Sequence, residues 1–469
     1  MPPSRSDLRM GLLIARLRES GGLARESMWG FAYEGVALVS TIVAFTLLGR
    51  TLGPVGYGDY ASLYAIVGPL GNLAASGVPL ALLQHVVRDK TDVESVVRSC
   101  LTLTIVFGSA LTMLGVFVAA LVVPTLGLST ISAIILLEFV SLPVGSIAFT
   151  AVQSISGYIP ATQLRLIPLL VRLAVIVALS ASGQLTVTSL GFVYLGVSTV
   201  MSLVALRVVA NRYRISPWPG TPRSRDMKTS MQYSLGITGM SFQNDGDKAV
   251  LAAYGYREET GLYAAAYRIV QLGLLPVGVL FGVSHQRFLQ HHEGERNQHL
   301  RRSVKFAAVT AAYGLVFACV VVVIAPVLPR LVGEEFRGSV EMVRWLSPLV
   351  LLRSLALFPS NGLMGLGKTF LRSILLVVTA VVSMTLYIVL VPIMNWKGAV
   401  VGTMVGEALL AVLAWYFLLR YQRVDNDRID AGQQTTRDET ALDDTALDLI
   451  SEAVGLPDDH RLAEDPRGG

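Results

Sequence analysis

Long apolar runs alternate with short polar connections along most of the chain. A helix needs about 20 mostly apolar residues to cross the roughly 30 Å hydrocarbon core of a bilayer. By that measure the pattern predicts twelve transmembrane helices. In the first half they cover residues 28–49, 60–85, 99–123, 128–153, 166–181 and 187–206. In the second half they cover 231–253, 262–285, 304–329, 341–363, 373–393 and 398–419. We therefore expect an all-α integral membrane protein.

The composition agrees with that pattern. Hydrophobic residues make up 53% of the chain and charged residues 15%, against the roughly 25% charged residues of soluble domains. The two cysteines, Cys100 and Cys319, are too few for a disulfide-stabilised or cysteine-rich metal protein. The first 26 residues lack the continuous apolar stretch of a secretory signal peptide.

The distribution of basic residues predicts the orientation. With twelve spans, both termini and every second connection lie on the same side of the membrane. That side carries 22 basic residues before the C-terminal tail is counted, and the opposite side carries five. Because positive charge accumulates in cytoplasmic loops, we expect a multi-pass cell-membrane protein with both termini in the cytoplasm.

The chain divides into five parts. We expect a cytoplasmic N-terminal segment (1–26), a first six-helix bundle (27–210), a basic cytoplasmic linker (211–230), a second six-helix bundle (231–420) and an acidic disordered cytoplasmic tail (421–469). The tail holds 13 of the 33 acidic residues, a composition typical of solvated, disordered segments. The net charge of +5 then reflects basic cytoplasmic loops, so no nucleic-acid partner is expected.

An internal repeat relates the two halves. Residues 58–67 and 261–270 are identical at six of ten positions, and each segment begins the second helix of a six-helix set. An offset of six spans preserves the orientation of a helix in the membrane, so the halves are parallel repeats. The repeat predicts two six-helix bundles around a central cavity, which bundle rocking opens alternately to either side.

Two motifs resemble a known family. Residues 48–61 (LGRTLGPVGYGDYA) are similar to the first-half signature of the polysaccharide and oligosaccharide flippases, which belong to the multidrug/oligosaccharidyl-lipid/polysaccharide (MOP) exporter superfamily. Asp247-Lys248, followed by residues 260–269 (TGLYAAAYRI), resembles the second-half signature. The likeness spans residues 25–423. It implies a carrier, functional as a monomer, that moves a lipid-linked oligosaccharide across the membrane for surface polysaccharide or glycoprotein assembly. Its partners would be that glycolipid, membrane lipids and membrane enzymes of glycan assembly.

Four basic residues lie inside predicted spans and are candidates for binding a polyprenyl or dolichyl phosphate head group: Arg268, Lys248, Arg172 and Arg353. A charge in the middle of a bilayer costs about 2.5–3.5 kcal/mol, so these residues should face the cavity or an opposite charge. A guanidinium group can donate two parallel hydrogen bonds to the oxygens of a phosphate. The alternative is structural pairing, for which Asp245 and Lys248 have the right spacing on a helix. The resemblance also aligns Arg268 with a basic position of the family.

Four carboxylates lie in or near the spans and are candidates for a coupling proton or sodium ion: Glu34, Glu407, Asp245 and Asp247. Buried carboxylates hold protons more readily than exposed ones. Neutral, hydrogen-bonded packing within one bundle is the alternative role for Glu34 and Glu407.

Other motifs do not predict enzymatic chemistry. Residues 362–369 (GLMGLGKT) fit a phosphate-binding loop, but apolar membrane runs flank them and leave no room for a nucleotide-binding domain. The histidines at 285, 291, 292 and 299 lie around a solvated connection and lack a convincing ligand arrangement. We therefore expect no catalytic residue, no metal site and no cofactor.

Three other functions fit parts of the pattern. An ion-coupled multidrug or metabolite antiporter of the same superfamily would have acidic residues dominating its cavity. A membrane glycan polymerase or ligase would need a large outer loop, whereas the longest connections on that side span about ten residues. A non-transporting scaffold would not depend on charges inside the membrane.

Overall fold

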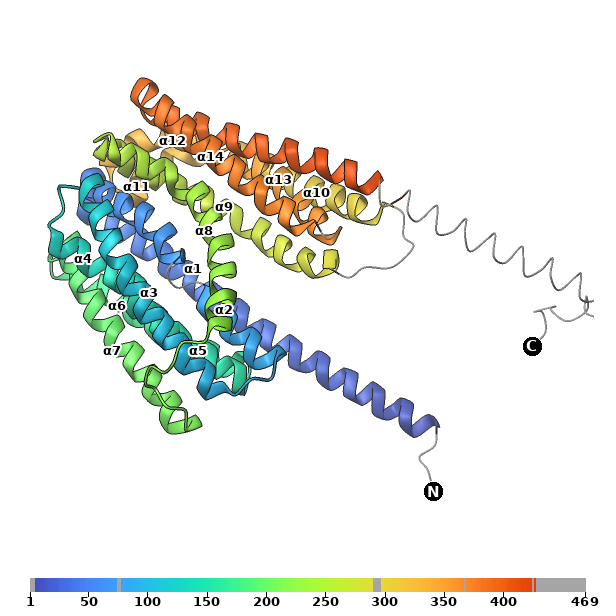
Figure 1. Cartoon of the computed structure of the whole chain (residues 1–469). Helices are drawn as coiled ribbons and strands as arrows, with labels where there is room; N and C mark the ends of the chain where they lie inside the picture. Colours follow the sequence, from blue (N-terminus) through green and yellow to red (C-terminus); the bar gives the residue numbers. More distant parts are fainter. Residues whose placement is uncertain (1–4, 74–76, 290–296, 367, 424–425, 427–469) are drawn as a thin grey trace, which may run out of the picture.

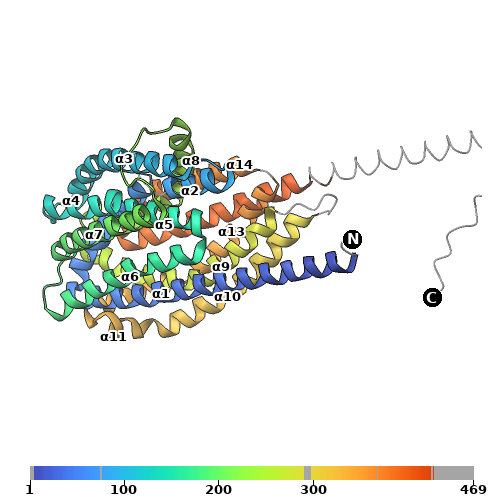
Figure 2. The same ribbon diagram turned by 90° about the horizontal axis from the view of Figure 1, so that it is seen from below.

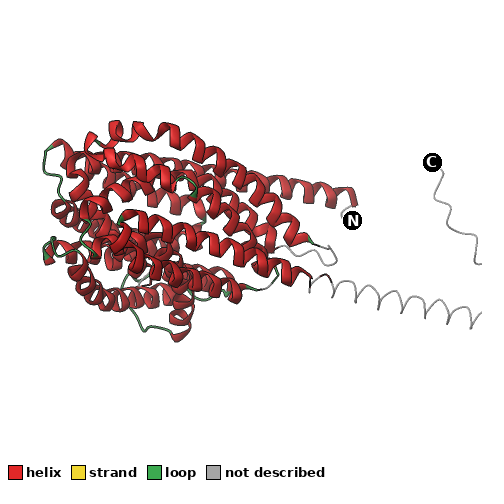
Figure 3. Ribbon diagram, turned by 90° about the horizontal axis from the view of Figure 1, so that it is seen from above, coloured by secondary structure: helices red, strands yellow, loops and turns green. Residues whose placement is uncertain are grey.

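The computed structural model describes residues 5–73, 77–289, 297–366, 368–423 and 426. The described residues form helices joined by short turns, and none of them lies in a strand (Figure 3). Most of the acidic tail lies outside the described part of the chain. The all-α fold predicted by the apolar pattern is confirmed.

The helices follow the two halves of the sequence. The first half contains α1 (Arg5–Gly71), α2 (Gly77–Leu83), η2 (Gln84–Arg88), α3 (Val93–Val122), α4 (Leu128–Leu136), η3 (Leu137–Ser141), α5 (Leu142–Ser156), α6 (Tyr158–Ala181) and α7 (Val187–Tyr213). The second half contains α8 (Ser224–Ala253), α9 (Arg257–Leu289), α10 (Gln298–Ile324), η4 (Ala325–Val327), α11 (Leu328–Val332), η5 (Glu334–Gly338), α12 (Ser339–Leu346), α13 (Leu349–Gly365), α14 (Thr369–Met394) and a last helix, Trp396–Arg423.

In the described residues, nine helices are long and apolar enough to cross a membrane. The bent pair Glu334–Leu346 and Leu349–Gly365 gives a tenth. Two predicted spans share α1, whose first rod (residues 28–52) and second rod (residues 54–71) meet at Gly53, with a φ of 65°. Glycine adopts this left-handed conformation without steric cost. The protein is a multi-pass membrane protein of helical bundles.

The start predicted for the fifth span is wrong. It was expected to start near residue 166, but α6 begins at Tyr158. Pro160 lies in the first turn of α6, where a backbone N–H has no intrahelical partner to lose. Pro168 lies inside the helix, as is tolerated in membrane helices.

The two halves touch at one end of the molecule and diverge toward the other. We call the end at which α1 begins and the last helix ends the terminal end, and the opposite end the far end. Figure 1 shows α1–α7 separating from α9 and the later helices toward the terminal end. Helix α1 packs against α6 of its own half and α9 of the other half (Figure 2).

Glycines of the repeat let the halves approach closely at the far end. A Cβ atom on Gly58 would lie 2.0 Å from the carbonyl oxygen of Arg257, and one on Gly261 would lie 1.9 Å from that of Pro54. Gly58 and Gly261 are separated by the repeat offset, and so are Pro54 and Arg257, whose carbonyls they meet. The repeated segments therefore pack on each other symmetrically. Small residues allow the backbones of neighbouring membrane helices to approach this closely.

Polar contacts extend this seam. The Arg257 guanidinium donates to both carboxylate oxygens of Asp59, with 2.7 Å between Nε and Oδ1. Arg50 donates from Nε to the Leu331 carbonyl at 2.8 Å and from Nη2 to that of Arg330 at 3.0 Å. The far-end seam therefore joins α1 to α9 and α11 through hydrogen bonds that must break if the halves separate there.

Helix α8 connects the two halves. Its first part contacts η2, where Asp226 lies 2.6 Å from His85 Nδ1, and packs on α2, where Ser234 Oγ accepts from the Gly77 amide at 3.0 Å. Its last part packs on α14, where a Cβ on Gly246 would lie 2.8 Å from Met384 Cε. One helix thus crosses from the first half to the second (Figure 1).

Candidate functional site

Two of the four predicted head-group residues line one cavity. This arginine cavity, about 260 Å³ in volume, lies between both rods of α1, α6, α7 and α9. Arg172 enters it from the first half and Arg268 from the second. The remaining lining residues are mainly tyrosines, small polar residues and aliphatic residues: Tyr57, Tyr60, Tyr194, Ser40, Thr41, Ala44, Phe45, Leu48, Leu169, Leu173 and Ile176.

Arg172 is held by groups of the first half. Its guanidinium lies 4.7 Å from the centre of the Tyr194 ring, and Nη2 is 4.0 Å from a carboxylate oxygen of Glu138. The Tyr64 hydroxyl donates to the same Glu138 oxygen at 3.2 Å. A contact of 4.0 Å is at the limit of an ion pair, and 31% of the Arg172 side chain is exposed. Arg172 therefore keeps hydrogen-bonding capacity for an anion in the cavity.

Arg268 has a neutral partner. Its Nη1 donates to Gln271 Oε1 at 3.1 Å, one turn along α9, and the side chain is exposed. Within the described part of the chain no carboxylate forms an ion pair with it. Arg268 and Arg172 thus give the cavity a positive charge that Glu138 only partly balances.

An apolar groove meets the arginine cavity at Arg268. This groove, about 770 Å³ in volume, runs between the first rod of α1 and α9. Thr41, Phe45 and Arg268 line both the cavity and the groove. The groove has two further polar side chains, those of Glu34 and Gln271. The rest of its lining is aliphatic or glycine: Gly35, Ala37, Leu38, Ile42, Leu272, Leu274, Leu275, Gly278 and Val279.

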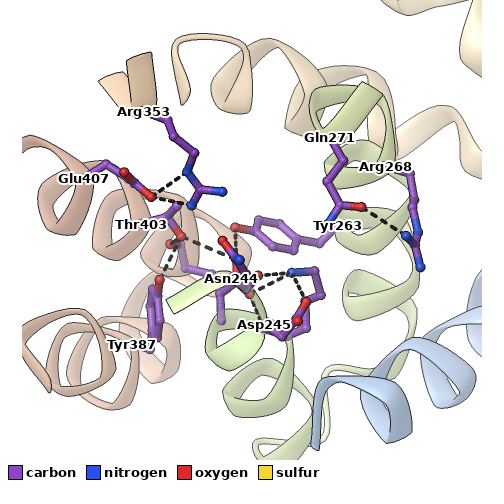
Figure 4. Close-up of polar contacts among 12 residues, drawn as sticks. Asn244, Asp245, Tyr263, Arg268, Gln271, Arg353, Tyr387, Thr403 and Glu407 are labelled. Atoms are coloured by element: carbon purple, nitrogen blue, oxygen red, sulfur yellow. Dashed lines mark hydrogen bonds and ion pairs between the residues drawn. The ribbon is translucent and has the colours of Figure 1, made fainter. Parts of the chain in front are cut away.

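The other two predicted head-group residues have carboxylate partners in the second half. Arg353 of α13 donates to Glu407 of the last helix, with 2.9 Å between Nε and Oε1. Lys248 Nζ lies 3.0 Å from Asp247 and 3.3 Å from Asp245. Figure 4 shows the Arg353–Glu407 pair on one side of this network, with Arg268 and Gln271 on the other.

Aromatic and hydroxyl groups complete the network. Lys248 Nζ lies 3.7 Å from the centre of the Tyr267 ring. Tyr263 donates to Asp247 Oδ2 at 2.8 Å, and Thr403 contacts the same oxygen at 3.4 Å. Because Asp247, Lys248 and Glu407 are buried, these bonds hold α8, α9, α13 and the last helix together.

We expect the Arg353–Glu407 pair to be essential for stability. Arg353→Met should lower the free energy of unfolding by about 3–5 kcal/mol, because the buried Glu407 would lose the cation that balances its charge. The double variant Arg353→Met/Glu407→Gln should lose less, since neither charge remains. Thermal unfolding in detergent measures the difference, with the exposed Arg344→Met as control. Equal or greater loss in the double variant would contradict a paired role.

The four predicted coupling carboxylates are distributed differently. Glu34 lines the apolar groove, whereas Glu407 and Asp247 are buried in ion pairs. Asp245 is 30% exposed and shares Lys248 with Asp247. The structure thus brings three of the four carboxylates next to two of the predicted cations.

Sequence reasoning missed the tyrosines of the arginine cavity and the position of Glu138 beside it. A signal was present for Tyr60, and for Tyr64 beside Glu138, because these two residues correspond to Tyr263 and Tyr267 under the repeat offset. In both halves the second of these tyrosines touches an ionic group: Tyr64 bonds Glu138, and Tyr267 lies under Lys248.

The phosphate-binding-loop motif lies at the junction of two helices. Residues 362–365 are the last turn of α13, and α14 follows at Thr369, so the phosphate-loop pattern joins two helices. Among the described residues no group of three His, Cys, Asp or Glu side chains is placed to hold a metal. His291 and His292 lie outside the described residues.

Comparisons with known proteins agree with this architecture. The model of a family described as "polysaccharide biosynthesis protein" matches residues 28–285. An inward-facing multidrug resistance MATE transporter of the MOP superfamily is 15% identical, with a TM-score of 0.66 over 85% of this chain and 96% of that one. An outward-facing MATE transporter is 16% identical, with a TM-score of 0.57 over 88% and 96%.

A MOP superfamily transporter from Pyrococcus furiosus, described as having a binding pocket of reverse polarity, is 15% identical. Its TM-score is 0.55 over 87% of this chain and 95% of that chain. A search of curated proteins gives no significant match. At these identities the solved structures establish the fold, and the family model covers more than half of the chain. The chain therefore belongs to the polysaccharide biosynthesis protein family and has the fold of a MOP-superfamily transporter.

Proposed function

We propose that the protein is a flippase that moves a lipid-linked oligosaccharide from the cytoplasmic to the outer leaflet by alternating access. The observation that carries this proposal is the junction of a cationic cavity with an apolar groove at Arg268. A polyprenyl or dolichyl phosphate carries its anionic group directly on an apolar chain. The junction offers a place for each part, with phosphate on the arginines and chain in the groove.

We assign the head group to Arg172 and Arg268. Both line the same cavity, and neither is matched by a close, fully buried carboxylate. Lys248 and Arg353 have such partners, so we propose that they hold the second half together and act on the substrate indirectly. Of the coupling candidates, Glu34 lies beside the path of the lipid, where a proton or sodium ion could reach it.

The orientation completes the proposal. With the positive-inside prediction, the terminal end faces the cytoplasm and the far-end seam closes the outer side. The higher TM-score to the inward-facing transporter than to the outward-facing one supports this conformation. The glycolipid would enter from the cytoplasmic leaflet, and breaking the seam would release its head group outside. We expect a working monomer, with glycan-assembly enzymes of the same membrane as partners.

An ion-coupled multidrug antiporter is the second candidate, because the matching solved structures are described as multidrug transporters. Such a protein would take cationic drugs. The two arginines of the cavity disfavour that substrate class, since like charges repel at short range.

A strain that lacks the protein tests the proposal. We expect lipid-linked glycan to accumulate on the inner leaflet and the wild-type gene to clear it, with no change in sensitivity to cationic drugs. Head-group accessibility to a membrane-impermeant glycosidase or lectin measures the leaflet. Unchanged glycolipid together with altered drug sensitivity would contradict the flippase and favour the antiporter.

A further inference from the structure

The early start of α6 places one more basic residue inside a membrane span. The start predicted near residue 166 leaves Arg165 outside the membrane, but the span observed is Tyr158–Ala181 and contains it. An ionisable residue inside a span is costly, so it marks either a buried pair or a binding path. Among the described residues no carboxylate forms an ion pair with Arg165, which favours the binding path.

The contacts of Arg165 are neutral and long. Its Nη2 donates to Thr150 Oγ1 and to Gln153 Oε1 on α5, each at 3.4 Å. The usual N–H···O distance is about 2.9–3.0 Å, so both bonds are weak. In the described part of the chain, Nε and Nη1 have no acceptor. Arg165 therefore keeps N–H groups for an anion, and a guanidinium presents them in a planar fork that matches phosphate oxygens.

Arg165 and Arg172 lie on one face of α6. Residues seven apart in a helix are two turns from each other, about 10.5 Å along the axis. Because α6 begins at the terminal end, Arg165 is the nearer of the two to that end. The first rod of α1 runs in the same direction, and Tyr33 precedes the cavity residue Ser40 by the same seven positions. Tyr33 and Arg165 are thus two turns nearer the terminal end than the arginine cavity.

Contacts between α1 and α6 support this placement. Tyr33 lies within electrostatic range of Arg165 and of Tyr158. A Cβ on Gly30 would lie 3.2 Å from the Tyr158 hydroxyl oxygen, so the first rod of α1 packs on the first turn of α6. Glu34, the neighbour of Tyr33, lines the apolar groove. Arg165 therefore lies near the groove, toward the end at which the two halves diverge (Figure 1).

The arginine cavity holds a further group without a partner. Ser40 lines it together with Arg172 and Arg268, and the Ser40 hydroxyl is buried without a hydrogen-bond partner. Buried polar groups are normally hydrogen-bonded, and a phosphate oxygen would supply the missing partner. The cavity thus offers an anion two arginines and a hydroxyl, whereas the position nearer the terminal end offers one arginine.

We propose that Arg165 is an entry site for the phosphate of the lipid-linked substrate. The phosphate binds first at Arg165, beside Tyr33, and then moves two turns along α6 to Arg172 and the arginine cavity. This inference deepens the proposed flippase function and rests on it. Charged groups pass along a path when each site attracts them enough to enter and holds them weakly enough to leave. A single arginine before a site with two meets that condition.

Binding kinetics of the purified full-length protein test the entry site. The probe is a short-chain polyprenyl phosphate, and stopped-flow fluorescence measures its association and dissociation rate constants. A site along the path lowers the barrier in both directions and leaves the final complex unchanged. Arg165→Gln should therefore slow association and dissociation by the same factor, about fivefold, and leave Kd within about twofold of wild type. Arg165→Lys keeps the charge and should restore both rates.

Two further variants separate entry from other roles. Arg172→Gln removes a group of the final site and should raise Kd about tenfold, chiefly through faster dissociation. Arg207→Gln is the matched control. The exposed Arg207 is six residues from the Tyr213 end of α7, a depth similar to that of Arg165, which is seven from the start of α6. Arg207 lines neither the cavity nor the groove, so both rates should stay unchanged.

The entry site is overturned if Arg165→Gln leaves both rates as they are in wild type, or if it raises Kd as Arg172→Gln does. Inorganic phosphate, at an ionic strength matched with chloride, should compete only weakly because it has no chain for the groove. Strong competition by it would assign the site to a soluble phosphate and overturn the lipid source. If wild type does not bind the polyprenyl phosphate at all, the proposed function fails, and the entry site with it.

Discussion

A cross-link between Asp59→Cys and Arg257→Cys is expected to stop transport completely. These residues form the ion pair of the far-end seam, and Gly58 and Gly261 pack beside it with backbone contact. If the seam must open to release the substrate, a covalent bridge across it holds the protein in one conformation. Transport in vesicles measured before and after cross-linking with a short bifunctional thiol reagent gives the result, and a reducible linker should restore activity on reduction.

The chain offers a matched control for this experiment. Thr125 donates to Asp59 at 3.2 Å, and both residues belong to the first half. Cross-linking Asp59→Cys to Thr125→Cys should therefore leave transport unchanged. The exposed Cys319 is replaced by serine in both proteins, and the buried Cys100 is retained. Full activity of the cross-linked Asp59–Arg257 protein would show that the seam does not open during transport.

Removing both cavity arginines is expected to have the second-largest effect. A hydrogen bond to a charged group contributes about 1.5–3 kcal/mol. Because Arg172 and Arg268 are partly exposed, the lower value applies to each. Arg172→Ala or Arg268→Ala should then weaken polyprenyl phosphate binding about tenfold, and the double variant about a hundredfold.

Equilibrium binding of polyprenyl phosphate to purified variants measures these losses. Arg344→Ala is the control, because Arg344 is an exposed arginine that lines neither the arginine cavity nor the groove. If the double variant and the wild type bind polyprenyl phosphate with equal affinity, the phosphate does not bind in this cavity.

Much of the fold follows from local sequence. Most predicted spans coincide with one long helix, because a membrane helix satisfies its own backbone hydrogen bonds. Helix α8 shows the limit of this reasoning: with Asn244, Asp245 and Lys248 in its last part, it fails the apolarity criterion that other spans meet. The predicted start of the fifth span is wrong because a proline in the first turn of a helix looks, in sequence, like a helix boundary.

The site depends on contacts between residues far apart in the chain, which the sequence alone does not predict. Arg172 and Arg268 lie in different halves, and their common cavity arises from the packing of α1 against α6 and α9. Arg353 and Lys248 have the same sequence signature, a base inside an apolar run, yet each has a buried carboxylate partner. Only the Asp245–Lys248 contact was readable from local helical spacing.

Flipping in reconstituted vesicles is the most direct test of the central claim. The protein is placed in vesicles with a fluorescent oligosaccharide linked to polyprenyl phosphate, and an impermeant quencher or glycosidase reports the leaflet. We expect wild type to equilibrate the glycolipid between leaflets and Arg172→Ala/Arg268→Ala to do so at most slowly. The absence of flipping by wild-type protein that exports a cationic drug from the same vesicles would contradict the account.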